Sequence, residues 1–297
     1  MADNPMSSVA QPHPAEPAEP GPPEAPFRGA AAWKPWTVGV ALIGSVSLVL
    51  AGRAIVATRS EGSEGSLLAI GIALILLNLA PIGLVLLLAK RQGRPTASDF
   101  GLRSPPLGRS IGLVIAGWIG LNVLTVLWAV ALGLDDGEGG PLTERLGTEG
   151  TLTVLILFVL LTVVGPLGEE FLFRGYIFRA LRNWRGVWPA AITTGILFAA
   201  THLGWLPIAL FVPSVVFGIA MCMLYHWTGS LYPCIALHAV NNSAALGFAL
   251  DWSWQIPLLV VCSIFAALTI AWLIALLLGD RPLRLGEERR EVWGQPV

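Results

Sequence analysis

Charged residues are scarce in this sequence of 297 residues. Only 12% are Asp, Glu, Lys or Arg, and 55% are hydrophobic, whereas roughly a quarter of an ordinary soluble domain is charged. The 18 basic and 19 acidic residues nearly cancel, and the basic ones form no stripe, which excludes a nucleic-acid partner. The composition therefore predicts an all-α, polytopic membrane protein.

Several common motifs are also missing. The cysteines Cys222, Cys234 and Cys262 form no CxxC pair or zinc-knuckle spacing, so we expect them to pack as small apolar side chains. There is no HExxH zinc motif. The chain also begins without the basic start and apolar core of a signal peptide.

Residues 1–32 are instead rich in Pro, Ala and Glu, which predicts a disordered tail. We expect the helical membrane domain to occupy residues 33–280 and a second tail to follow over 281–297.

Long apolar runs are what the sequence has in abundance. A bilayer core needs about 20 apolar residues of helix. On this basis we predict about eight transmembrane helices, at residues 36–57, 67–89, 111–132, 152–176, 188–203, 206–225, 230–250 and 256–278.

The basic residues predict the orientation of these spans. With an even number of spans, both ends of the chain lie on one side, and 15 of the 18 Lys and Arg residues fall on that side. The other three are Arg53, Arg59 and Arg145. By the positive-inside rule, we expect both termini to be cytoplasmic and the protein to lie in the plasma membrane.

The few ionisable residues within the later spans form three clusters, and the first is acidic. Charged groups in hydrocarbon persist only where they face one another or a wet cavity. Glu170 and Arg174 are four residues apart on one helix face, where the arginine can neutralise the carboxylate. Glu169 points about 100° away and has no partner on its own helix, which suits a general base acting on water. Pro166 predicts a bend just before this pair.

Two histidines supply the other clusters. His202 ends the fifth predicted span, and His238 shares a helix face with Asn242 in the seventh. His238 lies about 12 Å along its helix from Ser230, so this span must begin deeper or tilt if the three clusters are to meet. Two carboxylates, two imidazoles and a carboxamide predict one hydrolytic centre inside the membrane.

Three motifs in this order resemble the CPBP family of intramembrane proteases, the CAAX prenyl endopeptidase and bacteriocin-processing group. They are Glu169-Glu170-x-x-x-Arg174, Phe198-x-x-x-His202 and His238-x-x-x-Asn242, within a core of about residues 152–250. The segment Asp99 to Arg103 resembles a stretch often seen before that core.

This resemblance implies an endopeptidase whose active site lies in a conical cavity in the helix bundle, open to the cytoplasm. Its substrates would be membrane-associated peptides or proteins, prenylated or not. Glu169 would activate water with help from His202, and His238 and Asn242 would stabilise the oxyanion. Glu170 and Arg174 would be supporting residues.

Two questions stay open at the level of the sequence. His202, His238 and Glu169 could bind Zn²⁺ and leave a fourth position for water, or the same residues could act without a metal. The alternative function is a proton-coupled transporter or a non-catalytic immunity-type membrane protein that uses the same cluster. Against a transporter, the polar residues fall only in the second half, without matching broken helices in two halves.

Overall fold

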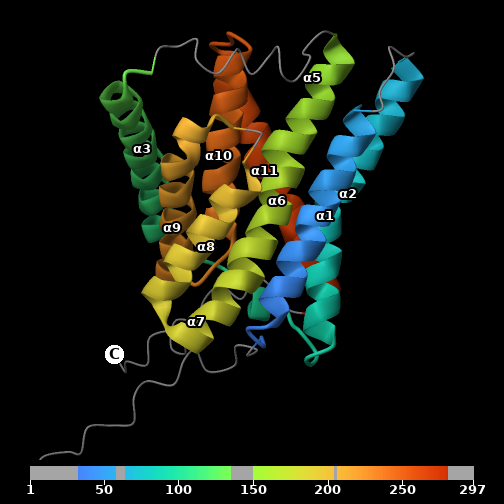
Figure 1. Cartoon of the computed structure of the whole chain (residues 1–297), viewed down its shortest axis with the longest axis vertical. Coiled ribbons are helices and arrows are strands. Elements are labelled where there is room, and N and C mark those ends of the chain that lie inside the picture. Colours follow the sequence, from blue (N-terminus) through green and yellow to red (C-terminus); the bar gives the residue numbers. More distant parts are fainter. Residues whose placement is uncertain (1–32, 58–63, 135–149, 204–205, 280–297) are drawn as a thin grey trace, which may run out of the picture.

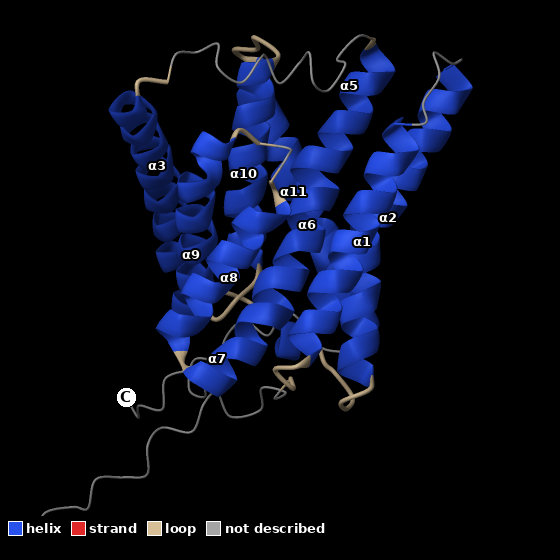
Figure 2. Ribbon diagram, viewed as in Figure 1, coloured by secondary structure: helices blue, strands red, loops and turns tan. Residues whose placement is uncertain are grey.

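The structure is a computed structural model that describes residues 33–57, 64–134, 150–203 and 206–279. These residues form eight helical rods that run alternately up and down (Figure 1). Figure 2 shows helices joined by short loops, and the one β-bridge within the described ranges pairs Leu203 with Leu206. The predicted tails, 1–32 and 281–297, lie outside the described residues.

The rods have the following bounds. They are α1 (Thr37–Ala57), α2 (Glu64–Lys90), α3 (Leu107–Leu132), the continuous rod of α5 (Thr151–Phe158), α6 (Gly165–Glu170) and α7 (Arg179–Arg185), then α8 (Val187–Thr201), α9 (Phe211–Thr228), α10 (Tyr232–Ala249) and α11 (Gln255–Leu277). Two π-helical stretches, η2 (Val159–Val164) and η3 (Phe171–Phe178), link α5, α6 and α7.

Each predicted span coincides with one rod, and two boundaries differ clearly. The predicted fourth span ended at residue 176, but the rod continues to Arg185 because residues 177–180 are buried against the rest of the bundle. The predicted sixth span began at residue 206, but α9 begins at Phe211 after a short 3₁₀ turn, η4 (Ile208–Leu210). Pro207, at the N-terminus of this turn, has an extended backbone that a helix cannot include.

Five of the helical stretches are long and apolar enough to cross a membrane. They are Leu67–Lys90, Leu107–Leu132, Thr151–Arg185, Ile208–Thr228 and Gln255–Leu277. Shorter apolar helices cover Thr37–Gly52 and Val187–Thr201. The protein is therefore a multi-pass membrane protein.

Glycines allow α8 and α9 to pack closely. A Cβ atom on Gly218 would come within 2.7 Å of the Cα atom of Gly195, so the two backbones touch where these glycines meet. This contact holds the helix that ends next to His202 against the middle of the bundle. Glycines with positive φ also form the corners on either side of this pair, Gly186 at 84° and Gly229 at 65°.

The segment before α3 covers the start of α10. It contains a 3₁₀ turn, η1 (Ser98–Phe100), and Gly101 O accepts a hydrogen bond of 2.7 Å from the backbone N–H of Leu231. Ser230 Oγ donates to Arg103 O at 2.7 Å. Ser230 and Leu231 are fully buried, so α10 begins beneath a covering layer.

The beginning of α1 lies at the same end of the bundle as the end of α2. The Lys34 N–H donates to Gln92 Oε1 at 2.6 Å, and the hydroxyls of Thr37 and Tyr176 lie 2.7 Å apart. Arg182 and Arg185 lie at the same end, at the lower side of Figure 1. We call it the basic end.

Candidate active site

Glu169 and Glu170 occupy the middle of the long rod. At about 1.5 Å per residue, they lie about 27 Å from its start at Thr151 and about 24 Å from its end at Arg185. The backbone widens into η2 before them and η3 after them, and such π turns often occur at functional sites. Pro166 lies in the first turn of α6, where the helix changes from π to α geometry.

Two side chains donate hydrogen bonds to the carboxylate of Glu170. Its Oε1 accepts hydrogen bonds from Arg174 Nη1 at 2.8 Å and from His238 Nδ1 at 2.7 Å. The side chains of Glu170 and Arg174 are completely buried, and that of His238 is 4% exposed. Arg174 Nη2 also donates to Gly218 O at 3.2 Å. The predicted clasp of Glu170 and Arg174 is present, and it also holds His238.

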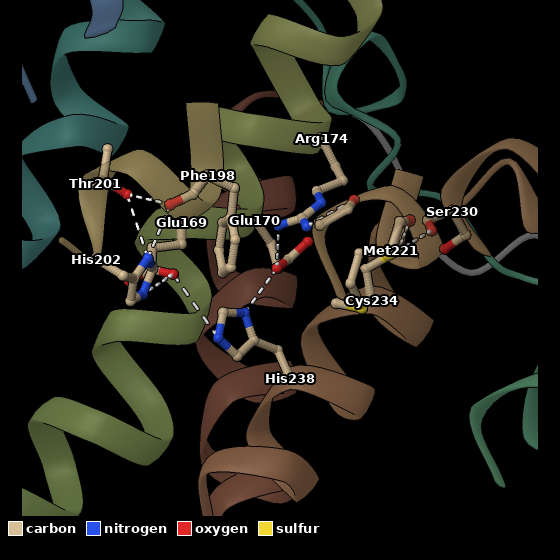
Figure 3. A network of polar contacts seen from close by, with 11 residues as sticks. Glu169, Glu170, Arg174, Phe198, Thr201, His202, Met221, Ser230, Cys234 and His238 are labelled. Atoms are coloured by element: carbon tan, nitrogen blue, oxygen red, sulfur yellow. Dashed lines mark hydrogen bonds and ion pairs between the residues drawn. The ribbon is translucent and has the colours of Figure 1, made fainter. Parts of the chain in front are cut away.

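Glu169 faces both histidines (Figure 3). Its Oε2 atom lies 3.8 Å from His202 Nε2 and 3.8 Å from His238 Nε2, and it has no hydrogen-bond partner within the described part of the chain. The side chains of Glu169 and His202 are 32% and 27% exposed. Separations of this size are too long for direct hydrogen bonds but suit a bridging water.

The second ring nitrogen of each imidazole has an acceptor as its partner. His238 Nδ1 donates to the Glu170 carboxylate, and His202 Nδ1 donates to Phe198 O at 2.9 Å. Because these oxygens only accept, Nδ1 carries the proton in both rings. The other ring nitrogen, Nε2, faces Glu169 Oε2 in both histidines.

Phe198 separates and supports the charged groups. Its ring centroid lies 4.6 Å from that of His202 and 6.0 Å from that of His238. The guanidinium carbon of Arg174 lies 4.9 Å from the same centroid. At 4% exposed, Phe198 keeps both imidazoles in fixed orientations.

Asn242 is oriented by the long rod. Its Nδ2 donates to Leu161 O in η2 at 2.9 Å, and its Oδ1 accepts from Asn241 Nδ2 at 3.4 Å. A carboxamide has two N–H donors, so one remains available for a ligand. The structure thus brings together Glu169, His202 and His238, and places Asn242 one turn further along α10.

Glu169, His202 and His238 are the predicted zinc ligands. Two Nε2 atoms and a carboxylate are suitable donors, but ligands of a tetrahedral zinc lie about 3.3 Å apart, less than the 3.8 Å seen here. No group of three or more His, Cys, Asp or Glu side chains in the described ranges could hold a metal ion. The arrangement does not fit zinc as it stands, and the zinc site remains a prediction.

Sequence reasoning missed three contacts of the site. They are the bond between His238 and Glu170, the support from Phe198 and the bond between Asn242 and Leu161 O. The first and third join segments 68 and 81 residues apart, so spacing along one helix could not reveal them. Phe198 was visible as the first residue of a motif shared with His202.

Fold and site together define a class: a multi-pass helical membrane protein with carboxylates and imidazoles gathered midway along its longest rod. Residues 151–244 match the family described as Rce1-like, type II CAAX prenyl endopeptidase. This part of the chain is an Rce1-like domain of the CPBP family, as the three motifs indicated. No curated protein and no solved structure matches the chain.

Proposed function

We propose that the protein is an intramembrane endopeptidase that cleaves membrane-associated peptides or proteins by activating a water molecule. The observation that carries this proposal is the position of Glu169 Oε2, 3.8 Å from the Nε2 atoms of both His202 and His238. Membership of a protease family over residues 151–244 supports the same reaction. All eight rods would cross the membrane, with the basic end and both termini cytoplasmic.

The first step is attack by water on the scissile carbonyl. Glu169 takes one proton from the water while His202 Nε2 orients it, and the hydroxide forms a bond to the carbonyl carbon. The side chains of Glu169 and His202 are about a third and a quarter exposed, and Glu169 Oε2 itself is a buried atom with no hydrogen-bond partner among the described residues. Glu169 then delivers the proton to the leaving nitrogen as the C–N bond breaks.

The oxyanion of the intermediate needs donors. His238 can serve when protonated, because its Nδ1–H is fixed on Glu170 and its Nε2–H then faces the reacting atoms. In the intermediate Glu169 holds the proton of the water and is neutral, and the charges of Glu170, Arg174, His238 and the oxyanion then cancel. The second N–H of Asn242 would supply another donor.

The experiment is a cleavage assay in lipid vesicles with a peptide library, which includes prenylated peptides ending in a CAAX motif. Glu169→Gln keeps the shape of the side chain and removes the base, so we expect a loss of at least about 10²-fold in turnover. Asp251→Asn is the matched control, since this exposed residue has a φ of 53° that asparagine tolerates.

Melting curves of both variants in detergent should match the wild type, which separates loss of chemistry from loss of fold. Equal cleavage by Glu169→Gln and wild type would overturn the assignment of the base. A wild-type protein that cleaves no member of the library would favour the non-catalytic alternative.

A further inference from the structure

Three hydroxyl groups form a buried chain between α10, α11 and η2. Ser243 Oγ donates to Ser263 Oγ at 3.0 Å, and Ser263 Oγ donates to Thr162 Oγ1 at 2.8 Å. Ser263 shares its proton with Leu259 O at 2.7 Å, and Thr162 Oγ1 donates to Phe158 O at 2.7 Å. The three hydroxyl-bearing residues are completely buried. Hydrogen bonds of this kind join neighbouring helices within a bilayer.

The hydroxyl chain runs beside the contact that orients Asn242. Ser243 follows Asn242 in α10, and Thr162 follows Leu161, whose O accepts from Asn242 Nδ2 at 2.9 Å. The amide contact and the hydroxyl chain therefore join η2 to α10 at neighbouring residues. Ser263 comes from a third helix, α11, which packs against both of them. It lies outside residues 151–244, the part of the chain that matches the protease family.

Leu161 O needs a donor from a side chain because the backbone of the rod supplies none. In α geometry its donor is the N–H of Gly165, but that group bonds Leu160 O in the wider π register. In π geometry the donor is residue 166, and Pro166 has no N–H. The carboxamide of Asn242 meets this requirement. Because a carbonyl only accepts, the contact also fixes which end of the carboxamide carries the N–H groups.

We propose that Ser263 is a positioning residue that keeps the Asn242 carboxamide on Leu161 O. Its hydroxyl holds η2 and α10 at the separation at which one N–H of Asn242 bonds the carbonyl and the other is left for the oxyanion. The catalytic consequence rests on the proposed function, in which Asn242 is an oxyanion donor. The orientation of Asn242 does not depend on that function and is measured separately.

Removing the hydroxyl breaks the chain in its middle. In Ser263→Ala, the Ser243 hydroxyl loses its acceptor and Thr162 Oγ1 loses a donor. Both groups are buried from water, so they turn to carbonyls of their own helices, and α10 is no longer tied to η2. A shift of about 1 Å at a catalytic group can lower the rate by about 10²-fold, and we expect part of this loss.

The first test compares kcat and KM in the lipid-vesicle assay for Ser263→Ala and a matched control, Ser45→Ala. Ser45 is a 4% exposed serine in α1, and its Oγ has no hydrogen-bond partner among the described residues, so its removal breaks no link. We expect Ser263→Ala to lower kcat by about tenfold or more with KM within about twofold of the wild type. Ser45→Ala should retain the wild-type kcat.

The dependence on Asn242 distinguishes positioning from a general structural role. In the Asn242→Ala background, Ser263→Ala should change kcat by less than about twofold, because the donor that it positions is already absent. If Ser263→Ala fails to fold, Ser243→Ala removes the same link from its other end and decides the question. The wild-type kcat in these variants, or an equal loss in both backgrounds, would overturn the proposal.

The second test reads the orientation of Asn242 without relying on cleavage. Protein labelled with ¹⁵N-asparagine in detergent micelles gives side-chain amide signals in NMR spectra, and those of Asn242 are the ones missing in Asn242→Ala. We expect Ser263→Ala to shift these signals and to speed their exchange with water, while Ser45→Ala leaves them in place. Unchanged signals in Ser263→Ala would overturn the proposal. Shifted signals in a protein that cleaves no peptide would support the positioning role and count against the proposed function alone.

Discussion

Removing Arg174 should destabilise the protein because it leaves the charge of Glu170 buried without its cation. Both side chains are completely buried, and Arg174 Nη1 lies 2.8 Å from Glu170 Oε1. Breaking such a pair by removing one partner costs about 3–5 kcal/mol. His238 also donates to the same oxygen and offsets part of that cost. We therefore expect Arg174→Met, which keeps most of the side-chain length, to lose about 3 kcal/mol.

A double-mutant cycle isolates the charge effect from lost packing. Glu170→Gln combined with Arg174→Met removes both charges, so the double variant should be more stable than the sum of the single losses, by about 0.5–3 kcal/mol. The bond from Arg174 to Gly218 O and its contact with Phe198 are lost in both backgrounds, and they cancel in the cycle. The assay is reversible unfolding in mixed detergent, with stability read from the transition midpoint.

Arg185→Met on the same rod is the control. Arg185 is exposed, and replacing an exposed residue should change the free energy of unfolding by less than about 0.5 kcal/mol. Strictly additive losses in the cycle would refute the coupling between Glu170 and Arg174. A stable Arg174→Met variant would also show that the buried pair is not what holds the rod in place.

Three further predictions concern the reaction and the membrane. Asn242→Ala should lower kcat by about 10²- to 10³-fold with little change in KM, as for an oxyanion donor; a rise in KM alone would assign Asn242 to substrate binding. If His202 and His238 bind zinc, elemental analysis should find one equivalent that chelation removes together with activity, and His→Ala at either position should abolish it; full activity after exhaustive chelation would contradict the zinc site. Cysteine-accessibility mapping should place residues 281–297 on the cytoplasmic side, and labelling from outside would reverse the orientation.

The helical architecture was predictable because hydrocarbon imposes a length on each apolar run. All eight predicted spans coincide with rods. Hydropathy did not reveal that the fourth rod continues to Arg185. A hydropathy profile shows where the apolar residues end, but the helical hydrogen bonding can continue beyond that point. Arg179 is polar and yet 2% exposed, and only tertiary packing accounts for its burial.

The residues that converge were also predictable, since each is an ionisable or amide group that an apolar span retains at a cost. Apart from the pairing of Glu170 with Arg174, their hydrogen-bond partners were not predictable. The proton on Nδ1 of His202 and His238 follows from Phe198 O and Glu170, and the second of these contacts crosses between helices far apart in sequence. The π geometry on either side of the acidic pair has no signature in the sequence beyond Pro166.

Glu169 and Glu170 are identical and adjacent, and their different surroundings explain why we propose only Glu169 as the base. Successive residues of a helix point about 100° apart, so Glu170 turns into the bundle toward Arg174 and His238, completely buried. Glu169 turns toward His202 and stays 32% exposed. Glu170 Oε1 already accepts two short hydrogen bonds, from Arg174 and from His238. In the proposed reaction the proton of the attacking water therefore goes to Glu169, and Glu170 fixes the ring of His238 with its Nε2 facing Glu169.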